Sequence, residues 1–194
     1  MKNKGLIFVI SGPSGSGKTT LLKELLAAAD LKGRLSRSIS LTTRPRRSGE
    51  RNGGDYFFIS REHFQELLRQ NKILEWTKYL GYYYGTPGDR LKQQIKKGRN
   101  IALCLDAKGA RTIKKLYPRN TVAIFVLPPS YKALGERIKR RCHKTGIDEI
   151  RKRLNLGQKE LRFVKQYDYS LVNKDLGRAL KKLKGIVLRL LKKS

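Results

Sequence analysis

Short apolar runs alternate with amphipathic segments along most of the chain. Continuous apolar runs at residues 6–10, 101–105 and 122–127 are typical of strands buried on both faces of a parallel sheet. Apolar side chains that recur every three or four positions predict helices. These apolar positions are Leu21, Leu22, Leu25 and Leu26; Phe64, Leu67 and Leu68; Ile150, Leu154 and Leu161; and Leu176, Leu180, Leu183, Val187, Leu190 and Leu191. The alternation predicts an α/β fold of three layers around a parallel sheet, with its ligand at the carboxyl ends of the strands.

Residues 36–90 interrupt this alternation with a mixed insert that is rich in strand-forming side chains. Within it, residues 36–41 alternate weakly enough to be one short strand, and residues 56–59 form another candidate strand. Between them, residues 42–55 form a polar segment dense in Arg and Gly, which predicts a loop.

Turn and capping residues mark the other boundaries of the insert. Ser60 is placed to cap the helix that follows it. Gly81 indicates a tight hairpin within residues 73–84. Thr86 and Pro87 together have the pattern of a helix start, with Thr86 as the cap and Pro87 at the first helical position.

Beyond the insert, further helices are separated by turn signals. A short helix is predicted over residues 109–116 and a longer one from 131 to about 142. A polar break over residues 143–148 precedes the helix of Ile150, and residues 171–172 form a last short strand.

One glycine-rich segment carries recognisable chemistry. Residues 12–19 read Gly-Pro-Ser-Gly-Ser-Gly-Lys-Thr, the spacing G-x-x-x-x-G-K-T between a predicted strand and a predicted helix. Its backbone N–H groups can turn inward around phosphate oxygens, and the helix N-terminus adds positive dipole. Lys18 is placed to reach the β- and γ-phosphates, and the Thr19 hydroxyl to complete Mg²⁺ coordination. The strand and helix on either side argue against an accidental glycine-rich turn. The residues expected at the nucleotide phosphates are Gly12, Pro13, Ser14, Gly15, Ser16, Gly17, Lys18, Thr19 and Thr20.

Charge adds a second consideration. The 194 residues include 45 Lys and Arg but only 15 Asp and Glu, a formal net charge of +30. Such a field concentrates anionic ligands and binds RNA non-specifically at low salt. The basic residues are spread along the chain without an RNP-like aromatic motif, which favours a solvated basic surface, so charge alone does not make this a nucleic-acid-binding protein.

Other features of the composition point to an ordinary single-domain protein of the cytoplasm. The apolar runs are far shorter than a membrane span, and the run at 6–10 enters the glycine-rich segment directly, so we expect neither a signal peptide nor a membrane contact. Cys104 and Cys142 match no metal-binding spacing and no disulfide framework.

A second anion site is predicted on the Arg-rich loop. Arg44 and Arg47 lie there, and Tyr56 and Tyr84 are available as hydroxyl donors. Guanidinium groups bind phosphate oxygens bidentately. The alternative is a solvated arginine loop with no ligand.

Short motifs along nearly the whole chain are similar, in order and in register, to those of guanylate kinases. They are Ser11-Gly12-Pro13-Ser14-Gly15-Ser16-Gly17-Lys18-Thr19, Ser40-x-Thr42-Thr43-Arg44, Arg47-x-Gly49-Glu50, Gly54-Asp55-Tyr56, Glu75-Trp76, Tyr83-Tyr84-Gly85-Thr86, Asp106-x-x-Gly109, Pro128-Pro129-Ser130 and Tyr169-x-x-Val172-Asn173. Each motif is weak alone, but the ordered set is specific. The chain resembles guanylate kinases of the bacterial type.

The resemblance implies a single domain built from three parts. A P-loop NTPase core would comprise residues of about 1–35, 91–130 and 156–194. A mixed α/β GMP-binding subdomain would span about 36–90, and a helical lid about 131–155. Both of these smaller parts are mobile in the family.

The resemblance also implies roles for individual residues. Those at positions that hold GMP are Ser40, Arg44, Arg47, Glu50, Tyr56, Glu75, Tyr84, Thr86 and Asp106. Within that set, Ser40, Glu75, Thr86 and Asp106 match guanine-recognising positions. The chemistry agrees, because a carboxylate accepts from both guanine N1–H and the exocyclic amine, and a hydroxyl donates to O6. Adenine would leave the carboxylate unpaired, which gives discrimination of roughly 10⁴-fold or more.

The lid would complete the site over the transferred phosphoryl group. Arg137, Arg141 and Arg153 match the family's lid arginines, and Asn173 matches a position near the ATP adenine. Phosphoryl transfer needs charge stabilisation and exclusion of water rather than covalent help. The resemblance thus implies Mg²⁺-dependent transfer from ATP to GMP, and to dGMP, in purine metabolism by a monomer or weak homo-oligomer.

The chain departs from the family pattern at a few positions. Cys104 stands where the family has the first Asp of an Asp-x-Asp pair, and Arg140 and Cys142 stand where a Gly is usual. Three alternatives remain open from sequence. They are a non-catalytic guanylate-kinase-like module that binds proteins, a nucleic-acid-binding protein, and a nucleoside-monophosphate kinase that selects another base.

Overall fold

A five-stranded parallel sheet forms the centre of the computed structural model, which describes residues 5–141 and 146–193, with only the backbone of Arg141. The strand order is β2-β7-β1-β8-β9 and every pairing is parallel. The strands are β1 (Ile7–Ser11), β2 (Leu35–Arg37), β7 (Asn100–Cys104), β8 (Thr121–Leu127) and β9 (Tyr169–Val172). The three apolar runs of the sequence are confirmed as neighbouring strands β7, β1 and β8.

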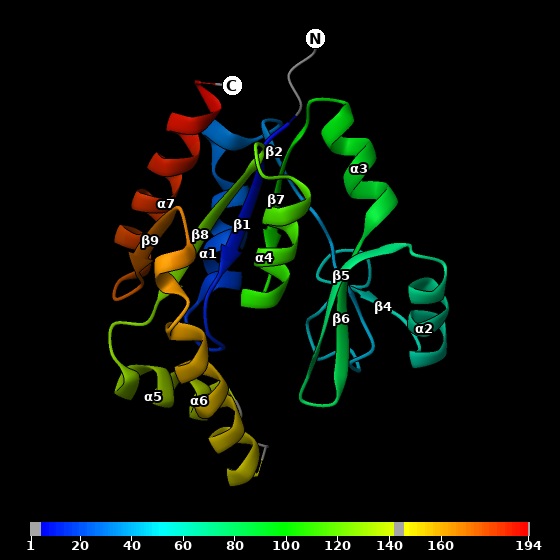
Figure 1. Cartoon of the computed structure of the whole chain (residues 1–194). Coiled ribbons are helices and arrows are strands. Elements are labelled where there is room, and N and C mark those ends of the chain that lie inside the picture. Colours follow the sequence, from blue (N-terminus) through cyan, green and yellow to red (C-terminus); the bar gives the residue numbers. More distant parts are fainter. Residues whose placement is uncertain (1–4, 142–145, 194) are drawn as a thin grey trace.

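Helices cover both faces of this sheet, as Figure 1 shows. They are α1 (Lys18–Ala27), α3 (Gly88–Lys96), α4 (Ala107–Leu116) and α7 (Leu176–Leu191). Side chains alternate along β1, so Phe8 and Ile10 pack in the cluster of α1 and α7, whereas Ile7 and Val9 pack in the cluster of α3 and α4. This confirms the three-layer α/β architecture.

A smaller mixed sheet with the order β4-β3-β6-β5 lies beside the core. It consists of β3 (Leu41–Thr42), β4 (Phe57–Phe58), β5 (Ile73–Tyr79) and β6 (Tyr82–Pro87), together with the helix α2 (Arg61–Arg69). The hairpin between β5 and β6 turns at Leu80 and Gly81, whose φ angles of 51° and 86° are typical of a type I′ turn.

A third part lies beyond the carboxyl ends of the core strands (Figure 1). It is the helix pair α5 (Tyr131–Arg141) and α6 (Ile147–Leu161), joined to the core by the short 3₁₀ helix η2 (Val164–Gln166). Another 3₁₀ helix, η1 (Ala29–Leu31), follows α1. Leu134 and Ile138 of α5 pack against Ile150 and Leu154 of α6, so the pair has a small apolar cluster of its own.

The single strand expected over residues 36–41 is two strands in different sheets. β2 ends at Arg37, where the Ser38 N–H still donates to Ala102 O of the core at 2.9 Å. The Ser40 carbonyl then accepts from Phe57 of the smaller sheet at 2.9 Å, and β3 begins at Leu41. The chain crosses between sheets within these few residues, which a periodicity of two cannot reveal.

Three helix starts also differ from expectation. Thr86 lies in β6 and does not cap α3, because the Thr86 hydroxyl donates to Glu75 on β5. The N-cap of α3 is Pro87. α4 begins at Ala107, earlier than residue 109, since Asp106 caps it through the Gly109 N–H at 2.8 Å. α6 begins at Ile147, inside the predicted polar break. Ser60 does cap α2, as expected.

Nothing in the described part of the chain forms a helix both long enough and apolar enough to span a lipid bilayer.

Candidate active site

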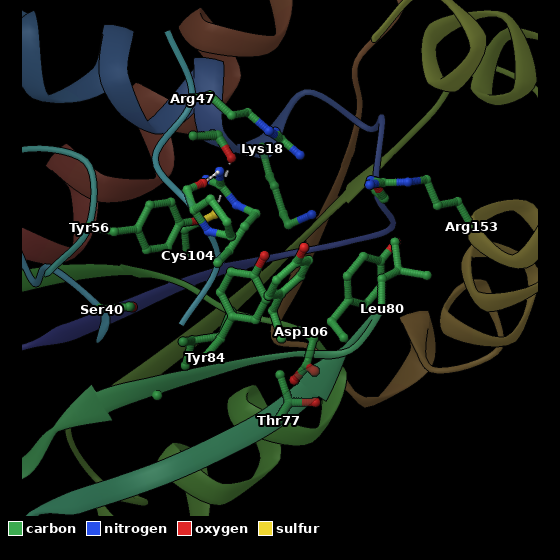
Figure 2. A pocket seen from close by; sticks show the side chains of 18 of the residues that line it. Lys18, Ser40, Arg47, Tyr56, Thr77, Leu80, Tyr84, Cys104, Asp106 and Arg153 are labelled. Carbon is green, nitrogen blue, oxygen red and sulfur yellow. Dashed lines mark hydrogen bonds between the residues drawn. The ribbon is translucent and has the colours of Figure 1, made fainter. Parts of the chain in front are cut away.

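A cavity of about 850 Å³ lies where the glycine-rich loop, the smaller sheet and α6 meet. Its lining includes Ser14, three residues after β1, and Leu105, which directly follows β7, so the cavity lies at the carboxyl ends of the core strands, where a ligand is expected. The predicted site residues that it brings together are Ser14, Lys18, Thr19, Ser40, Arg44, Arg47, Tyr56, Glu75, Tyr84, Asp106 and Arg153. In Figure 2, Lys18, at the start of α1, and Arg153, on α6, point toward the same space.

The glycine-rich loop has the left-handed backbone that its sequence requires. Gly12, Gly15 and Gly17 have φ angles of 138°, 87° and 88°. A Cβ on Gly12 would lie 2.3 Å from the Val126 carbonyl oxygen, so a side chain there would displace the loop from β8. Lys18 Nζ donates to Pro13 O at 3.2 Å and is thereby folded back over the loop. This is the arrangement that a phosphate cradle needs.

Asn173, predicted at ATP, supports this loop directly, and Arg137, a predicted lid arginine, in turn supports Asn173. Asn173, which is 5% exposed, donates from Nδ2 to Ser16 O at 2.8 Å. Arg137 Nη2 donates to Asn173 O at 2.9 Å. Neither residue lines the cavity, and neither does Thr20, so their contacts with a nucleotide stay predictions.

On the Arg-rich loop, Arg44 is held in place by a carboxylate. Its Nη2 donates to both Glu50 oxygens, at 2.7 and 2.9 Å, and the same carboxylate accepts from the Arg47 N–H at 2.9 Å. Burial acts to raise the pKa of Glu50, but hydrogen bonds from Arg44 and Arg47 outweigh it and lower that pKa. Glu50 does not line the cavity. It therefore orients Arg44 toward the cavity rather than facing a ligand itself.

Tyr56 and Tyr84 complete this anion-binding wall. The Arg44 guanidinium carbon lies 5.8 Å from the centre of the Tyr56 ring, and the two tyrosine rings meet edge to face at 5.9 Å. Burial raises the pKa of Tyr56 to about 12, so its hydroxyl stays protonated and can donate near neutral pH. The combination of one fixed guanidinium with the Tyr56 hydroxyl and the neighbouring Tyr84 suits a phosphate group.

The other end of the cavity holds a buried carboxyl. Glu75 is 6% exposed, and the Thr86 hydroxyl donates to its Oε1 at 2.5 Å. Burial raises the pKa of Glu75 to about 7, with the Thr86 hydrogen bond opposing the rise and Asp106 adding to it. A Cβ on Gly109 would lie 2.6 Å from Glu75 Oε2, so only glycine lets the first turn of α4 approach this carboxyl. The Thr86 hydroxyl is engaged with Glu75, and Thr86 itself does not line the cavity, whereas Ser40 does.

One face of α6 forms the opposite wall. Arg153, Gly157 and Glu160 are spaced at one and two turns and so share that face. Arg153, only 7% exposed, donates from Nε and Nη2 to Glu149 Oε1 at 3.0 and 2.6 Å, and Nη1 is 3.5 Å from Ser14 Oγ. Gly157 keeps the helix close to the loop, since a Cβ there would be 3.3 Å from Pro13 Cβ.

Glu160 is a cavity residue that sequence reasoning missed. Burial raises its pKa to about 7, opposed by the nearby charge of Lys18 and reinforced by Asp106. Its separation of two helical turns from Arg153 is the signal that would have found it. Glu149, one turn before Arg153, was missed for the same reason.

Tyr79 was also missed, although strand alternation contained the signal. Glu75, Thr77 and Tyr79 alternate along β5 and all line the cavity. Leu80, which follows at the hairpin turn, lines it too.

The structure says less about two predicted features. The side chain of Arg141 lies outside the described residues, so its role stays a prediction. Cys104, which replaces a carboxylate of the family pattern, places Sγ 3.7 Å from Thr19 Oγ1. Among the described residues no cluster of three or more His, Cys, Asp or Glu could hold a metal ion. Mg²⁺ needs few protein ligands when phosphates supply oxygens, and the exposed Thr19 hydroxyl fits that need better than the soft sulfur of Cys104.

Comparisons with known proteins agree on one family. The family model described as guanylate kinase matches residues 4–190. Guanylate kinase of Desulfitobacterium hafniense strain Y51 is 43% identical over 190 residues, covering 96% of this chain and 91% of that protein. Guanylate kinase of Mycoplasma genitalium is 42% identical over 188 residues, with 97% and 77% covered. The crystal structure of guanylate kinase from Anaplasma phagocytophilum superposes with a TM-score of 0.79 at 30% identity, covering 98% of this chain and 88% of that one. This chain belongs to the guanylate kinase family.

Proposed function

We propose that the cavity aligns ATP on the glycine-rich loop with GMP on the smaller sheet, so that the γ-phosphoryl group passes directly between them. Phosphorylation of GMP by ATP is the activity of the family to which the chain belongs. The roles that follow for individual residues, and the requirement for Mg²⁺, are our proposals.

The observation that carries these roles is the arrangement of unlike groups along one cavity. The buried Glu75, paired with Thr86, the carboxylate-held Arg44, and the cations Lys18 and Arg153, which point toward the same space in Figure 2, all line it. These three kinds of group suit a base, its phosphate and a second phosphate chain. Glu75 would accept from guanine N1–H and the amine, while the Ser40 hydroxyl donates to O6 and Asp106 borders the base.

On the acceptor side, the anion-binding wall would fix the GMP phosphate. Arg44, Arg47, Tyr56 and Tyr84 would donate to its oxygens, with Glu50 holding Arg44 in position. The attacking atom is a phosphate oxygen of GMP, so no side chain needs to act as a nucleophile, and alignment supplies much of the rate enhancement.

On the donor side, Lys18 and the lid arginines would stabilise charge on the moving group. Arg153 already faces Lys18, and Arg137 and Arg141 would act from α5. Thr19 would hold Mg²⁺, which when bound neutralises charge on the phosphates. Approach of α6 to the hairpin would exclude water from the transfer.

Further properties belong to the same proposal. We expect dGMP to serve as a second acceptor and the enzyme to act in the cytoplasm as a monomer or weak homo-oligomer. The net charge of +30 supports weak contact with RNA and other polyanions. A filter-binding titration with unstructured RNA should show affinity that falls steeply between low and physiological salt. Affinity that persists at high salt would contradict a purely electrostatic contact.

The test of the reaction is ADP release from Mg-ATP and GMP by wild-type enzyme and by two lysine variants. Lys18→Ala should abolish turnover because it removes the phosphate-facing ammonium group. Lys23→Ala, on the exposed side of α1, should leave turnover unchanged and controls for the loss of one positive charge. Tight GMP binding by a wild-type protein without turnover would refute the enzyme and favour a binding module.

A further inference from the structure

Tyr79 is the point where all three parts of the molecule meet. It is the last residue of β5 in the smaller sheet. The guanidinium carbon of Arg153, on α6, lies 5.8 Å from the centre of its ring. Ser14 of the glycine-rich loop lies close enough for its hydroxyl to influence the Tyr79 pKa. One side chain thus borders the acceptor sheet, the lid helix and the phosphate loop.

The hydroxyl of Tyr79 is buried, and its approach to the Ser14 hydroxyl falls short of a hydrogen bond of ordinary length and angle, so among the described residues it has no such bond. The other such hydroxyl among those residues is Ser16, in the glycine-rich loop itself. A buried donor without a partner is costly and rare in folded proteins, so each calls for a partner supplied from elsewhere. Of the two residues, Tyr79 lines the cavity and Ser16 does not.

The surroundings of Tyr79 specify an anionic partner. Lys18 and Arg153 line the same cavity, and Ser14 belongs to the loop whose N–H groups face phosphate. Burial raises the pKa of Tyr79, although the Ser14 hydroxyl and the Arg153 charge oppose the rise, so the phenol remains a donor near neutral pH. Glu149 and Glu160 line the cavity as well, and Glu160 adds to the rise in the Tyr79 pKa. A neutral donor beside Lys18 and Arg153 is complementary to phosphate oxygens.

The backbone holds Tyr79 in this position. It pairs with Tyr82 across the hairpin, and the intervening turn carries Leu80 in the left-handed region at φ 51°. A short turn of this type fixes the register of its strands, so the direction of the Tyr79 side chain is set by the hairpin rather than by a mobile loop.

We propose that Tyr79 donates a hydrogen bond to the phosphate chain between the two nucleotides, and that its ring positions Arg153 beside that chain. This inference rests on the proposed function. The contact forms fully only when both nucleotides are present, because the hydroxyl comes from the acceptor sheet whereas the phosphates it meets lie on the loop and under α6. Tyr79 would thereby link occupancy of the GMP site to closure over ATP.

The test compares Tyr79→Phe, which keeps the ring, with Tyr79→Leu, which removes it. Tyr83→Phe is the matched control, because Tyr83 lies in the same hairpin but stacks on Phe64 and does not line the cavity. Measured quantities are kcat, both KM values, the Kd for GMP alone, and the Kd for a bisubstrate analogue in which adenosine and guanosine are joined by five phosphates. Thermal unfolding checks that each variant folds.

Tyr79→Phe should lower kcat and weaken analogue binding about 10- to 100-fold, the range for one hydrogen bond to a charged group. Binding of GMP alone should change less than about twofold, and Tyr79→Leu should lose more through Arg153. If the wild-type enzyme turns over GMP and Tyr79→Phe has the same kcat and the same Kd for the analogue, the inference is overturned while the proposed function stays intact. Equal losses for GMP alone and for the analogue would also overturn it, since Tyr79 would then serve only the acceptor site.

Discussion

Protonation of Glu75 should control GMP affinity across neutral pH. Burial raises the pKa of this carboxyl to about 7 in the unliganded protein. Guanine presents two donors to it, so the base binds the carboxylate and must expel the proton from the carboxylic acid. Binding GMP therefore lowers the pKa, and proton release accompanies binding.

The magnitude follows from this pKa. The apparent Kd is multiplied by one plus the ratio of protonated to ionised Glu75, a factor of about 11 at pH 6 and about 1.1 at pH 8. Affinity for GMP should therefore rise about tenfold between these pH values through Glu75 alone. Titration of the GMP phosphate adds its own pH dependence to the affinity. The Glu75→Gln variant retains this part, so its pH dependence can be subtracted from that of the wild type.

Calorimetric titration of GMP provides the assay. Repeating the titration at pH 7 in two buffers of different ionisation enthalpy should reveal release of about half a proton from Glu75. Glu75→Gln should bind GMP more weakly at pH 8 and show only the dependence due to phosphate. The same pH dependence in wild type and Glu75→Gln would refute the reasoning.

Three further predictions concern residues that support the site. Glu50→Gln should raise the KM for GMP about tenfold with a smaller change in kcat, because the carboxylate that fixes Arg44 is lost; an unchanged KM in steady-state assays would contradict this. Asn173→Ala should lower the free energy of unfolding by about 1–2 kcal/mol and raise the KM for ATP, since the bond to Ser16 O is lost; denaturant unfolding measures the first effect. Glu160 has a pKa of about 7 when folded against 4.5 ordinarily, so its contribution to stability is complete below about pH 4.5 and is lost as pH rises through 7. Glu160→Gln should therefore stabilise the protein relative to wild type at pH 8, by at most about 3 kcal/mol, but not at pH 4.5, and an equal effect at both pH values would contradict burial as the cause.

The core of the fold was predictable because its apolar sequence patterns correspond directly to the strands and helix faces that are buried. The continuous apolar runs became β1, β7 and β8, since strands covered on both faces cannot alternate. The final helix spans residues 176–191, as its periodicity predicted. Likewise, the glycine-rich loop and the Arg-rich loop both contribute residues to one cavity, among them Ser14, Lys18, Arg44 and Arg47.

Sequence patterns did not reveal side-chain contacts between residues that are distant in the sequence. Thr86 has the sequence context of a helix cap, yet its hydroxyl is used by Glu75 on the adjacent strand. The bond from Asn173 to Ser16 O was likewise not visible in the local sequence, because Ser16 is remote along the chain; the predicted nucleotide contact of Asn173 stays a prediction. The spacing of Glu160 from Arg153 places both residues on one face of α6, but local pattern does not specify how that face packs against the loop.

The ratio of kcat/KM for GMP to that for AMP, with Mg-ATP as donor, tests the central claim most directly. A carboxylate that must pair with guanine donors predicts a ratio of roughly 10⁴ or more, because adenine leaves Glu75 unpaired. Glu75→Gln should lower the ratio by reducing the rate with GMP. Comparable wild-type rates with both nucleotides would contradict the assignment of this cavity to guanine.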